Sequence, residues 1–410
     1  MAYEVAIDAL DFTSLMRRGD RVAWGQAGAE PLSLTERLMA QRHAIGEFRA
    51  FIGMSLSATV AKEHTDCVRF ESYCASGSNR VLAKNELLDI WPCHYSQLAA
   101  SVGAIDVLML QVAEGPEGYS YSCAAEYMAQ MVKSAGLVIA EVNDQAPWTH
   151  GEPLAEEDID IFVRSSRPLP QLPSPMDGEA ERTIAAHVAN LIVDGATIQV
   201  GLGALPDAIL RGLADHRDLG IHSGALSDTV VDLIQQGVIN NRHKGVDPGV
   251  SVGGVLFGSR KLYDFVHNNP QVHLRSTAYT HSHSVLANQD NLVTLNSAIE
   301  VDLTGQINSE MVGGHYVGAV GGAMDFLRGA HFSKGGLPII ILPSTAAGGK
   351  VSRIVTDLNG PVSSPRADAG IFVTEYGVAD LRGKTLNQRK KLMLSICHPD
   401  FRGDLSRDLG

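Results

Sequence analysis

Short, uninterrupted hydrophobic runs recur along this chain, and segments with helical periodicity separate them. The clearest runs are residues 106–113, 136–142, 338–343 and 370–377. Apolar runs of this length without alternation indicate strands that are buried on both faces, as in a parallel sheet. Helical segments such as 124–134 and 227–237 lie between the strands. The alternation predicts an α/β fold, in which ligands gather at the carboxyl ends of the strands.

A proline-rich stretch divides the chain near its middle. Residues 164–180 read RSSRPLPQLPSPMDGEA, and four prolines in so short a span favour an extended linker. A chain of 410 residues is also too long for one ordinary hydrophobic core. We therefore expect two α/β domains, residues 1–170 and 181–410.

The two halves resemble each other at their beginnings. GDRVAWGQAGAEPLSLTERL begins at Gly19, and GATIQVGLGALPDAILRGLADH begins at Gly195. Both segments read as glycine, short strand, glycine turn, proline and amphipathic helix. Gly25 and Gly201 repeat the 176-residue offset of the first pair. The match predicts a duplicated α/β unit, with the two segments in equivalent positions.

Composition and charge narrow the class of protein. Hydrophobic residues make up 45% of the chain, and the formal net charge is −13. These values indicate a globular protein and argue against nucleic acid or an anionic membrane as a partner. No apolar run reaches membrane length, and the five scattered cysteines fit neither a disulfide framework nor a zinc site. We expect a cytoplasmic, soluble homo-oligomer with reduced thiols.

Two glycine-rich segments could approach a ligand with their backbone. In Val200–Leu210 a strand ends in glycines, and a helix follows with Pro206 in its first turn. Amides at such a helix start favour an anion, although a tight turn without a ligand is the simpler alternative. In Ser309–Gly336, eight of 28 residues are glycine. That density predicts an irregular loop that offers N–H groups to a substrate oxygen, or a long structural loop.

Several polar residues near these segments are candidates for chemistry. Asp302 and Glu310 could each act as a base, but a solvated or helix-capping carboxylate is the commoner outcome. His281 and His283 would share a face in a strand, which is compatible with a metal. Without a third ligand nearby, a hydrogen-bond donor or a packed histidine is favoured, and we expect no metal. In Leu219–Asp228, a strand-like start leads to a helix at Ser227 or Asp228.

Taken together, these segments resemble the acetyl-CoA hydrolase / 4-hydroxybutyrate CoA-transferase family over nearly the whole chain. The similar segments include RRGDRVAWGQAGAEP, GSNR, VIAEVNDQAPWTHGE, GLGALPDAIL, FGSRKLYDF, LNSAIEVDLTGQINSE, GAVGGAMDFLRGAHFSKGG, LPSTAAGGKVSRIV, VTEYGVADLRGKTL and HPDFR. The resemblance implies two similar CoA-transferase-type domains with the active site at their interface. It also implies coenzyme A as a substrate, in transfer between a short-chain acyl-CoA and a carboxylate.

The resemblance further implies a set of site residues. Those expected near coenzyme A and its thioester are Gly201, Leu202, Gly203, Ala204, Gly318 and Gly321. The amide of Gly322 would help to form an oxyanion hole. The family normally has a nucleophilic glutamate where this chain has Gly224, an asparagine near His281, and often a glutamine where this chain has Ala323. These three departures converge on one site and indicate a reshaped pocket.

Without a carboxylate at position 224, no glutamyl thioester can form there. Three interpretations remain open. Another carboxylate replaces the missing one, with Glu63, Glu71 and Glu310 as candidates; or His281 assists direct attack on the acyl-CoA as base or donor; or the protein binds CoA esters without turnover. We expect a transferase first and a hydrolase second. A sugar-phosphate isomerase-like enzyme is disfavoured by the glycine-rich segment and the duplication.

Overall fold

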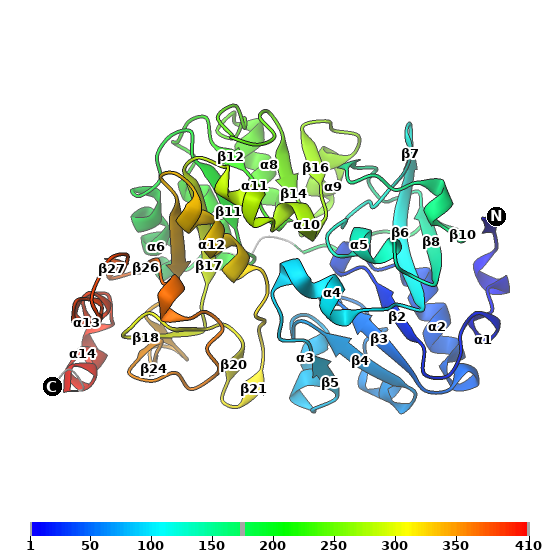
Figure 1. Ribbon diagram of the computed structural model, residues 1–410, viewed down its shortest axis with the longest axis horizontal. Helices are drawn as coiled ribbons and strands as arrows, with labels where there is room; N and C mark the ends of the chain where they lie inside the picture. The colour runs from blue at the N-terminus through cyan, green and yellow to red at the C-terminus, as the bar shows by residue number, and fades with distance from the viewer. Residues whose placement is uncertain (1, 173–176, 408–410) are drawn as a thin grey trace. The chain divides into compact units, whose positions relative to one another are not determined.

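Two compact units form the chain in the computed structural model, which describes residues 2–172 and 177–407 (Figure 1). The first unit comprises residues 1–173, 252–280 and 316–321, and the second comprises 174–251, 281–315 and 322–410. Each unit therefore combines segments that are distant in the sequence. The expected boundary between residues 170 and 181 stays a prediction, and the centre of the proline-rich stretch, 173–176, lies outside the described residues.

A parallel sheet forms the centre of the first unit. Its strands, in spatial order, are β1 (Tyr3–Glu4), β10 (Ile161–Ser165), β8 (Leu137–Asn143), β6 (Val107–Gly115), β2 (Arg21–Trp24), β3 (Phe48–Ile52), β4 (Val68–Ser72) and β5 (Leu88–Ile90). The short strand β7 (Gly118–Ser120) pairs antiparallel with β6. Trp24, Phe48 and Leu34 are buried in one core cluster between the sheet and its helices. Burying each such side chain contributes roughly 1.5–3 kcal/mol.

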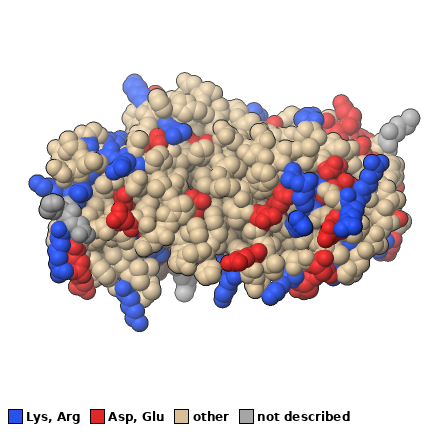
Figure 2. Space-filling view, turned by 60° about the horizontal axis from the view of Figure 1, so that its bottom comes forward, with Lys and Arg blue, Asp and Glu red and all other residues tan. Residues whose placement is uncertain are grey.

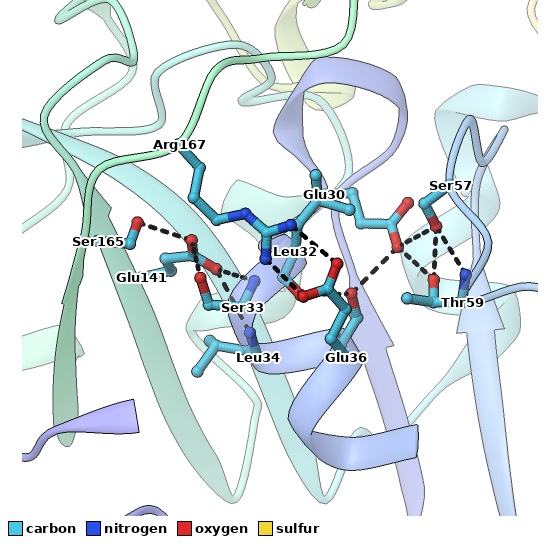
Figure 3. A network of polar contacts seen from close by, with 11 residues as sticks. Glu30, Leu32, Ser33, Leu34, Glu36, Ser57, Thr59, Glu141, Ser165 and Arg167 are labelled. Carbon is cyan, nitrogen blue, oxygen red and sulfur yellow. Dashed lines mark hydrogen bonds and ion pairs between the residues drawn. The ribbon is translucent and has the colours of Figure 1, made fainter. Parts of the chain in front are cut away.

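The helices of this unit are short, with one exception. They are α1 (Phe12–Leu15), α2 (Leu32–Ile45), α3 (Asn79–Lys84), α4 (Leu98–Val102), α5 (Met128–Val132), α9 (Arg260–Val266) and α10 (Thr277–Thr280). The long helix α2 begins after Pro31, which provides no side-chain cap. Glu141 on β8 replaces the cap: its carboxylate accepts the amides of Ser33 at 2.8 Å and Leu34 at 3.4 Å (Figure 3). A carboxylate at the positive end of a helix stabilises it.

The second unit has a sheet of its own. Its strands, in spatial order, are β12 (Gly220–Ile221), β11 (Thr197–Val200), β17 (Leu292–Ser297), β22 (Leu337–Ile341), β26 (Ile371–Thr374) and β27 (Gly377–Asp380), parallel except for the last pair. The helices are α6 (Glu179–Ala189), α7 (Ala204–Gly212), α8 (Asp228–Gln235), α11 (His283–Ala287), α12 (Ala323–Phe332), α13 (Leu386–Ser395) and α14 (Pro399–Arg407). Phe372, Ile340 and Leu327 lie in its main core cluster.

The predicted parallel strands are confirmed, because the four hydrophobic runs correspond to β6, β8, β22 and β26. The segment Leu219–Asp228 also behaves as expected, with Ser227 preceding α8. One prediction was wrong: the glycine-rich segment 309–336 is not irregular throughout, since α12 occupies its second half. Gly329 within α12 lies so close to Leu286 that a Cβ would approach the Leu286 Cβ to 2.5 Å. This glycine therefore serves close helix packing.

The repeated segments adopt matching strands but different turns. Gly19 and Gly195 both have positive φ, and the strand begins two residues later in each unit. After β2, a 3₁₀ turn (Ala27–Ala29) delays the helix until Leu32, whereas α7 follows β11 at Ala204. Equivalence of the two segments in space stays a prediction.

The surface carries both signs of charge. Lys and Arg side chains are interspersed with Asp and Glu over the face shown in Figure 2. Many of them form ion pairs, for example Arg42 with Asp66 at 2.9 Å. Within the described residues, no helix is long and apolar enough to cross a membrane.

Candidate active site

The carboxyl ends of β11 and β12 bring two predicted site segments together in the second unit. The strands pair in parallel, and β11 leads into the turn 201–204 while β12 leads into residues 222–224. The Ser223 hydroxyl donates to the Val200 carbonyl oxygen at 2.9 Å. The glycine turn expected near coenzyme A therefore lies beside Gly224, at the edge of the sheet where α/β folds place their ligands.

Backbone conformation explains one glycine of the turn 201–204. Gly203 precedes α7 with φ of +121°, and a Cβ there would meet nothing within 4 Å. Glycine is therefore required by the φ angle and not by crowding. Leu202 is 48% exposed, and the Gly201 amide donates to the Leu295 carbonyl at 2.9 Å. Pro206 lies in the first turn of α7, as predicted.

His281 fills the space beside Gly224. A Cβ on Gly224 would lie 3.1 Å from His281 Cε1, 3.3 Å from Nε2 and 3.6 Å from the Phe326 ring. The imidazole packs on Phe326 with ring centroids 4.5 Å apart. The interpretation of His281 and His283 as neighbours on a strand was wrong, because they flank the start of α11. His283 instead packs on Phe332, with ring centroids 4.7 Å apart.

The electrostatic surroundings make His281 a neutral imidazole. Burial, together with a smaller effect of the nearby His222, lowers the pKa of His281 to about 3. His222 is itself fully buried and contacts the Gln289 amide, with 3.5 Å between Nδ1 and Nε2. A neutral imidazole presents one N–H donor and one acceptor nitrogen. With so low a pKa, His281 is a weak general base at neutral pH, so a role as a donor is favoured.

A buried lysine supports the segment that carries Gly224. Lys244 Nζ donates to the carbonyl oxygens of Ile221 at 3.0 Å and Val250 at 2.7 Å. Burial lowers the pKa of Lys244 to about 7. Sequence reasoning missed both Lys244 and His222. His222 stands two residues before Gly224 and could have been noticed there, whereas Lys244 lies in a polar stretch with no sign of burial.

Three of the four candidate carboxylates are engaged in other interactions. Glu310 accepts a hydrogen bond from the Ser363 hydroxyl at 2.6 Å. Asp302 accepts hydrogen bonds from the backbone amides and the side chains of Thr304 and Gln306. Glu71, in the first unit, pairs with Arg21 and accepts the Trp91 indole N–H at 2.9 Å. Glu63 is exposed in the 3₁₀ turn Lys62–Asp66 of the same unit. Each role proposed for them stays a prediction.

The rest of the predicted CoA site belongs to another part of the chain. Gly318 and Gly321 lie in the first unit, where their carbonyl oxygens accept the amides of Ala75 at 3.2 Å and Tyr95 at 3.0 Å. Gly322 is the residue before α12, in the second unit. Its N–H precedes the helix and belongs to the amides that the helix itself does not use.

Comparison with known proteins covers almost the whole chain. Residues 3–176 match the acetyl-CoA hydrolase/transferase N-terminal domain, and residues 258–409 match the corresponding C-terminal domain. A 4-hydroxybutyrate coenzyme A transferase of Clostridium kluyveri is 39% identical over 99% of this chain and 97% of its own length. The crystal structure of RipA from Yersinia pestis has a TM-score of 0.92 at 31% identity, covering 98% of this chain and 96% of RipA. The crystal structure of a 4-hydroxybutyrate CoA-transferase from Porphyromonas gingivalis has a TM-score of 0.82 at 31% identity, covering 99% and 97%.

Proposed function

Because this chain belongs to the acetyl-CoA hydrolase/transferase family, we propose that it transfers coenzyme A between a short-chain acyl-CoA and a carboxylate. The near-complete coverage of a 4-hydroxybutyrate coenzyme A transferase supports this reaction class. The observation that carries the rest of the proposal is the packing of His281 against Gly224. A reacting carboxylate cannot come from position 224, and in this proposal it comes from the acceptor itself.

The proposed reaction proceeds without a covalent enzyme intermediate. A carboxylate oxygen of the acceptor attacks the thioester carbonyl carbon, the C–S bond breaks and CoA thiolate leaves, which produces a mixed anhydride. The thiolate then attacks the carbonyl carbon that came from the acceptor, and the original acyl group departs as a carboxylate. Atoms and charge balance in both steps, and no other co-reactant is required.

The roles of individual residues follow from their chemistry. In this proposal, the turn 201–204 and the glycines 318 and 321 contact the CoA thioester with their backbone. The N–H groups of His281 and Gly322 donate to the carbonyl oxygen as negative charge develops on it. The low pKa of His281 supports this role, since a neutral imidazole keeps one N–H for donation at neutral pH.

Hydrolysis of acyl-CoA is the second candidate function. One observation favours it: with glycine at position 224, no side chain there holds the acyl group, and a mixed anhydride that is not attached to the protein can react with water. Glu310 as a replacement nucleophile is less well supported, because its carboxylate already accepts the Ser363 hydroxyl.

Initial-rate kinetics separate these routes. A panel of short acyl-CoAs would be assayed with and without acetate, butyrate, 4-hydroxybutyrate, succinate or itaconate. Direct transfer predicts intersecting double-reciprocal lines and no protein adduct after borohydride or hydroxylamine treatment. Parallel lines with a trapped acidic residue would contradict it. Turnover without an acceptor, with label incorporated from ¹⁸O-water, would indicate the hydrolase. Tight binding of acyl-CoA without any turnover would overturn both the transferase and the hydrolase hypothesis.

A further inference from the structure

A buried carboxyl group lies at the carboxyl edge of the first unit's sheet. Glu126 is fully buried, and its Oε2 accepts the Gln26 amide at 2.8 Å and the Tyr95 hydroxyl at 2.5 Å. Its Oε1 is buried and, among the described residues, has no hydrogen-bond partner. A buried carboxyl with only one of its oxygens hydrogen-bonded is costly in free energy, so its presence requires an explanation.

Hydrogen bonds determine the orientation of the Gln26 and Tyr95 side chains beside this carboxyl. The Gln26 oxygen accepts the Tyr73 hydroxyl at 2.8 Å and the Met54 amide at 2.9 Å, so its nitrogen must face Glu126 and Tyr95. That nitrogen also donates to the Tyr95 hydroxyl oxygen at 2.9 Å. The Tyr73 and Tyr95 rings pack edge-on with centroids 5.0 Å apart. The network therefore holds Tyr95 in one position.

The same tyrosine holds the glycine-rich segment. The Tyr95 amide donates to the Gly321 carbonyl, and His94 forms a β-bridge with Gly321. A second hydrogen bond holds the segment at another point: the amide of Ala75 donates to the Gly318 carbonyl oxygen. Ala75 stands two residues after Tyr73 in the chain. Tyr95, which donates a hydrogen bond to Glu126, thus also holds the Gly321 end of segment 316–321.

We propose that Glu126 is a positioning residue, which determines through Tyr95 how firmly the glycine-rich segment 316–321 is held on the first unit. The attachment of segment 316–321 to the rest of the first unit does not depend on which reaction the protein catalyses. Its consequence for turnover rests on the proposed function, in which Gly318 and Gly321 contact the CoA thioester.

The state of Glu126 changes within the physiological pH range. Burial raises the pKa of Glu126 to about 7, against hydrogen bonds from Tyr95 and Gln26 that lower it. The titratable groups around it are Tyr73, Tyr95, Tyr127 and Cys74, and burial raises the pKa of each. They stay neutral while Glu126 titrates. Between the ordinary carboxyl pKa of 4.5 and about 7, the buried carboxyl keeps its proton, whereas a carboxyl that opens to water loses it. Opening therefore becomes easier as the pH rises toward 7 and changes no further above it.

Hydrogen exchange at the Tyr95 and Ala75 amides tests the docking without any turnover. After correction for intrinsic exchange, we expect wild-type protection to fall by up to about tenfold per pH unit between pH 5 and 7. Glu126→Gln should remove this pH dependence, and Tyr95→Phe should lower protection while its amide remains in place. Core amides of β6 serve as the reference for global opening. Protection at Tyr95 that is independent of pH in the wild type would overturn the proposal.

A matched control exists in the same unit. Glu30 is also buried, and burial raises its pKa, but hydroxyls of Thr35, Ser55, Ser57 and Thr59 satisfy its oxygens. Figure 3 shows the contacts with Ser57 and Thr59. Glu30→Gln should leave the Tyr95 and Ala75 amides unchanged. An equal effect of Glu30→Gln and Glu126→Gln on those amides would overturn the specific role of Glu126.

Kinetics then test the link to function. We expect the KM for acyl-CoA to rise between pH 5 and 7 in the wild type and to level off above pH 7. In Glu126→Gln it should vary severalfold less, and kcat should change little in both proteins. A KM for acyl-CoA that is independent of pH, found together with pH-dependent hydrogen exchange at Tyr95 and Ala75, would overturn the placement of segment 316–321 at the thioester. That result would not overturn the role of Glu126 in holding the segment. The two failures are therefore distinguishable.

Discussion

His281 Nε2 lies 3.3 Å from the position that a Cβ on Gly224 would occupy. Real Cβ atoms rarely make contacts this short, so even alanine at position 224 requires the imidazole to move by a few tenths of an ångström. A glutamate at position 224, which the family resemblance implies, would therefore fit only if the His281 imidazole moved.

Restoring the nucleophile should require two substitutions. We expect Gly224→Glu alone to destabilise the protein by about 1–3 kcal/mol, because it overpacks a buried site. Combined with His281→Asn, the glutamate gains room, and parallel double-reciprocal lines with a trapped glutamyl thioester should appear. Mass spectrometry of the protein treated with acyl-CoA and borohydride would detect it. The double variant would contradict this packing argument if it were no more stable than Gly224→Glu.

His281→Ala should lower kcat by about 10²–10³-fold if its N–H stabilises the developing oxyanion. Because burial lowers the pKa of His281 to about 3, its titration should give the wild-type rate no inflection between pH 5 and 9. His283→Ala is the control, since that ring packs on Phe332. Equal rates for the two variants would remove His281 from the reaction.

The turn before α7 offers a test of the proposed CoA contact. Gly203→Ala forces a side chain onto a residue with φ of +121°, which costs roughly 1–2 kcal/mol and displaces the turn. Gly201→Ala is the matched control, because its φ is unexceptional and its nearest neighbour would be the Leu295 oxygen at 3.4 Å. We expect calorimetry to show weaker CoA binding only for Gly203→Ala. Unchanged affinity in both variants, and in Gly321→Val, would displace CoA from this region.

Lys244 should make stability depend on pH in a defined window. Its pKa is lowered from 10.5 to about 7, so between these values the unfolded chain binds more protons than the folded chain. The free energy of unfolding should therefore rise with pH from about 7 upward, by up to about 1.4 kcal/mol per pH unit from this group. Lys244→Met should flatten the rise, measured by urea unfolding at pH 7.5 and 9. An identical slope in the variant would contradict the assignment.

The sequence alone could have revealed more of the first unit than it did. Gln26 occupies the position that the 176-residue offset pairs with Leu202, a predicted CoA contact. Extending the repeat to function would have drawn attention to it. Glu126 and Tyr95, in contrast, stand in segments without a glycine turn, and the contact between them depends on the order of strands in the sheet.

Some conclusions follow from neighbouring residues only. The buried parallel strands, the turn that begins α7, the family resemblance and the absence of a carboxylate at position 224 are all legible in contiguous sequence, because strand burial and helix starts depend on local patterns. Tertiary structure decided the rest. His281 lies against Gly224, Lys244 holds Ile221, and Glu126 reaches Gly321 through Tyr95, each across a long stretch of chain. Burial then sets the charge of these groups, and burial is a property of the packed fold that no local pattern contains.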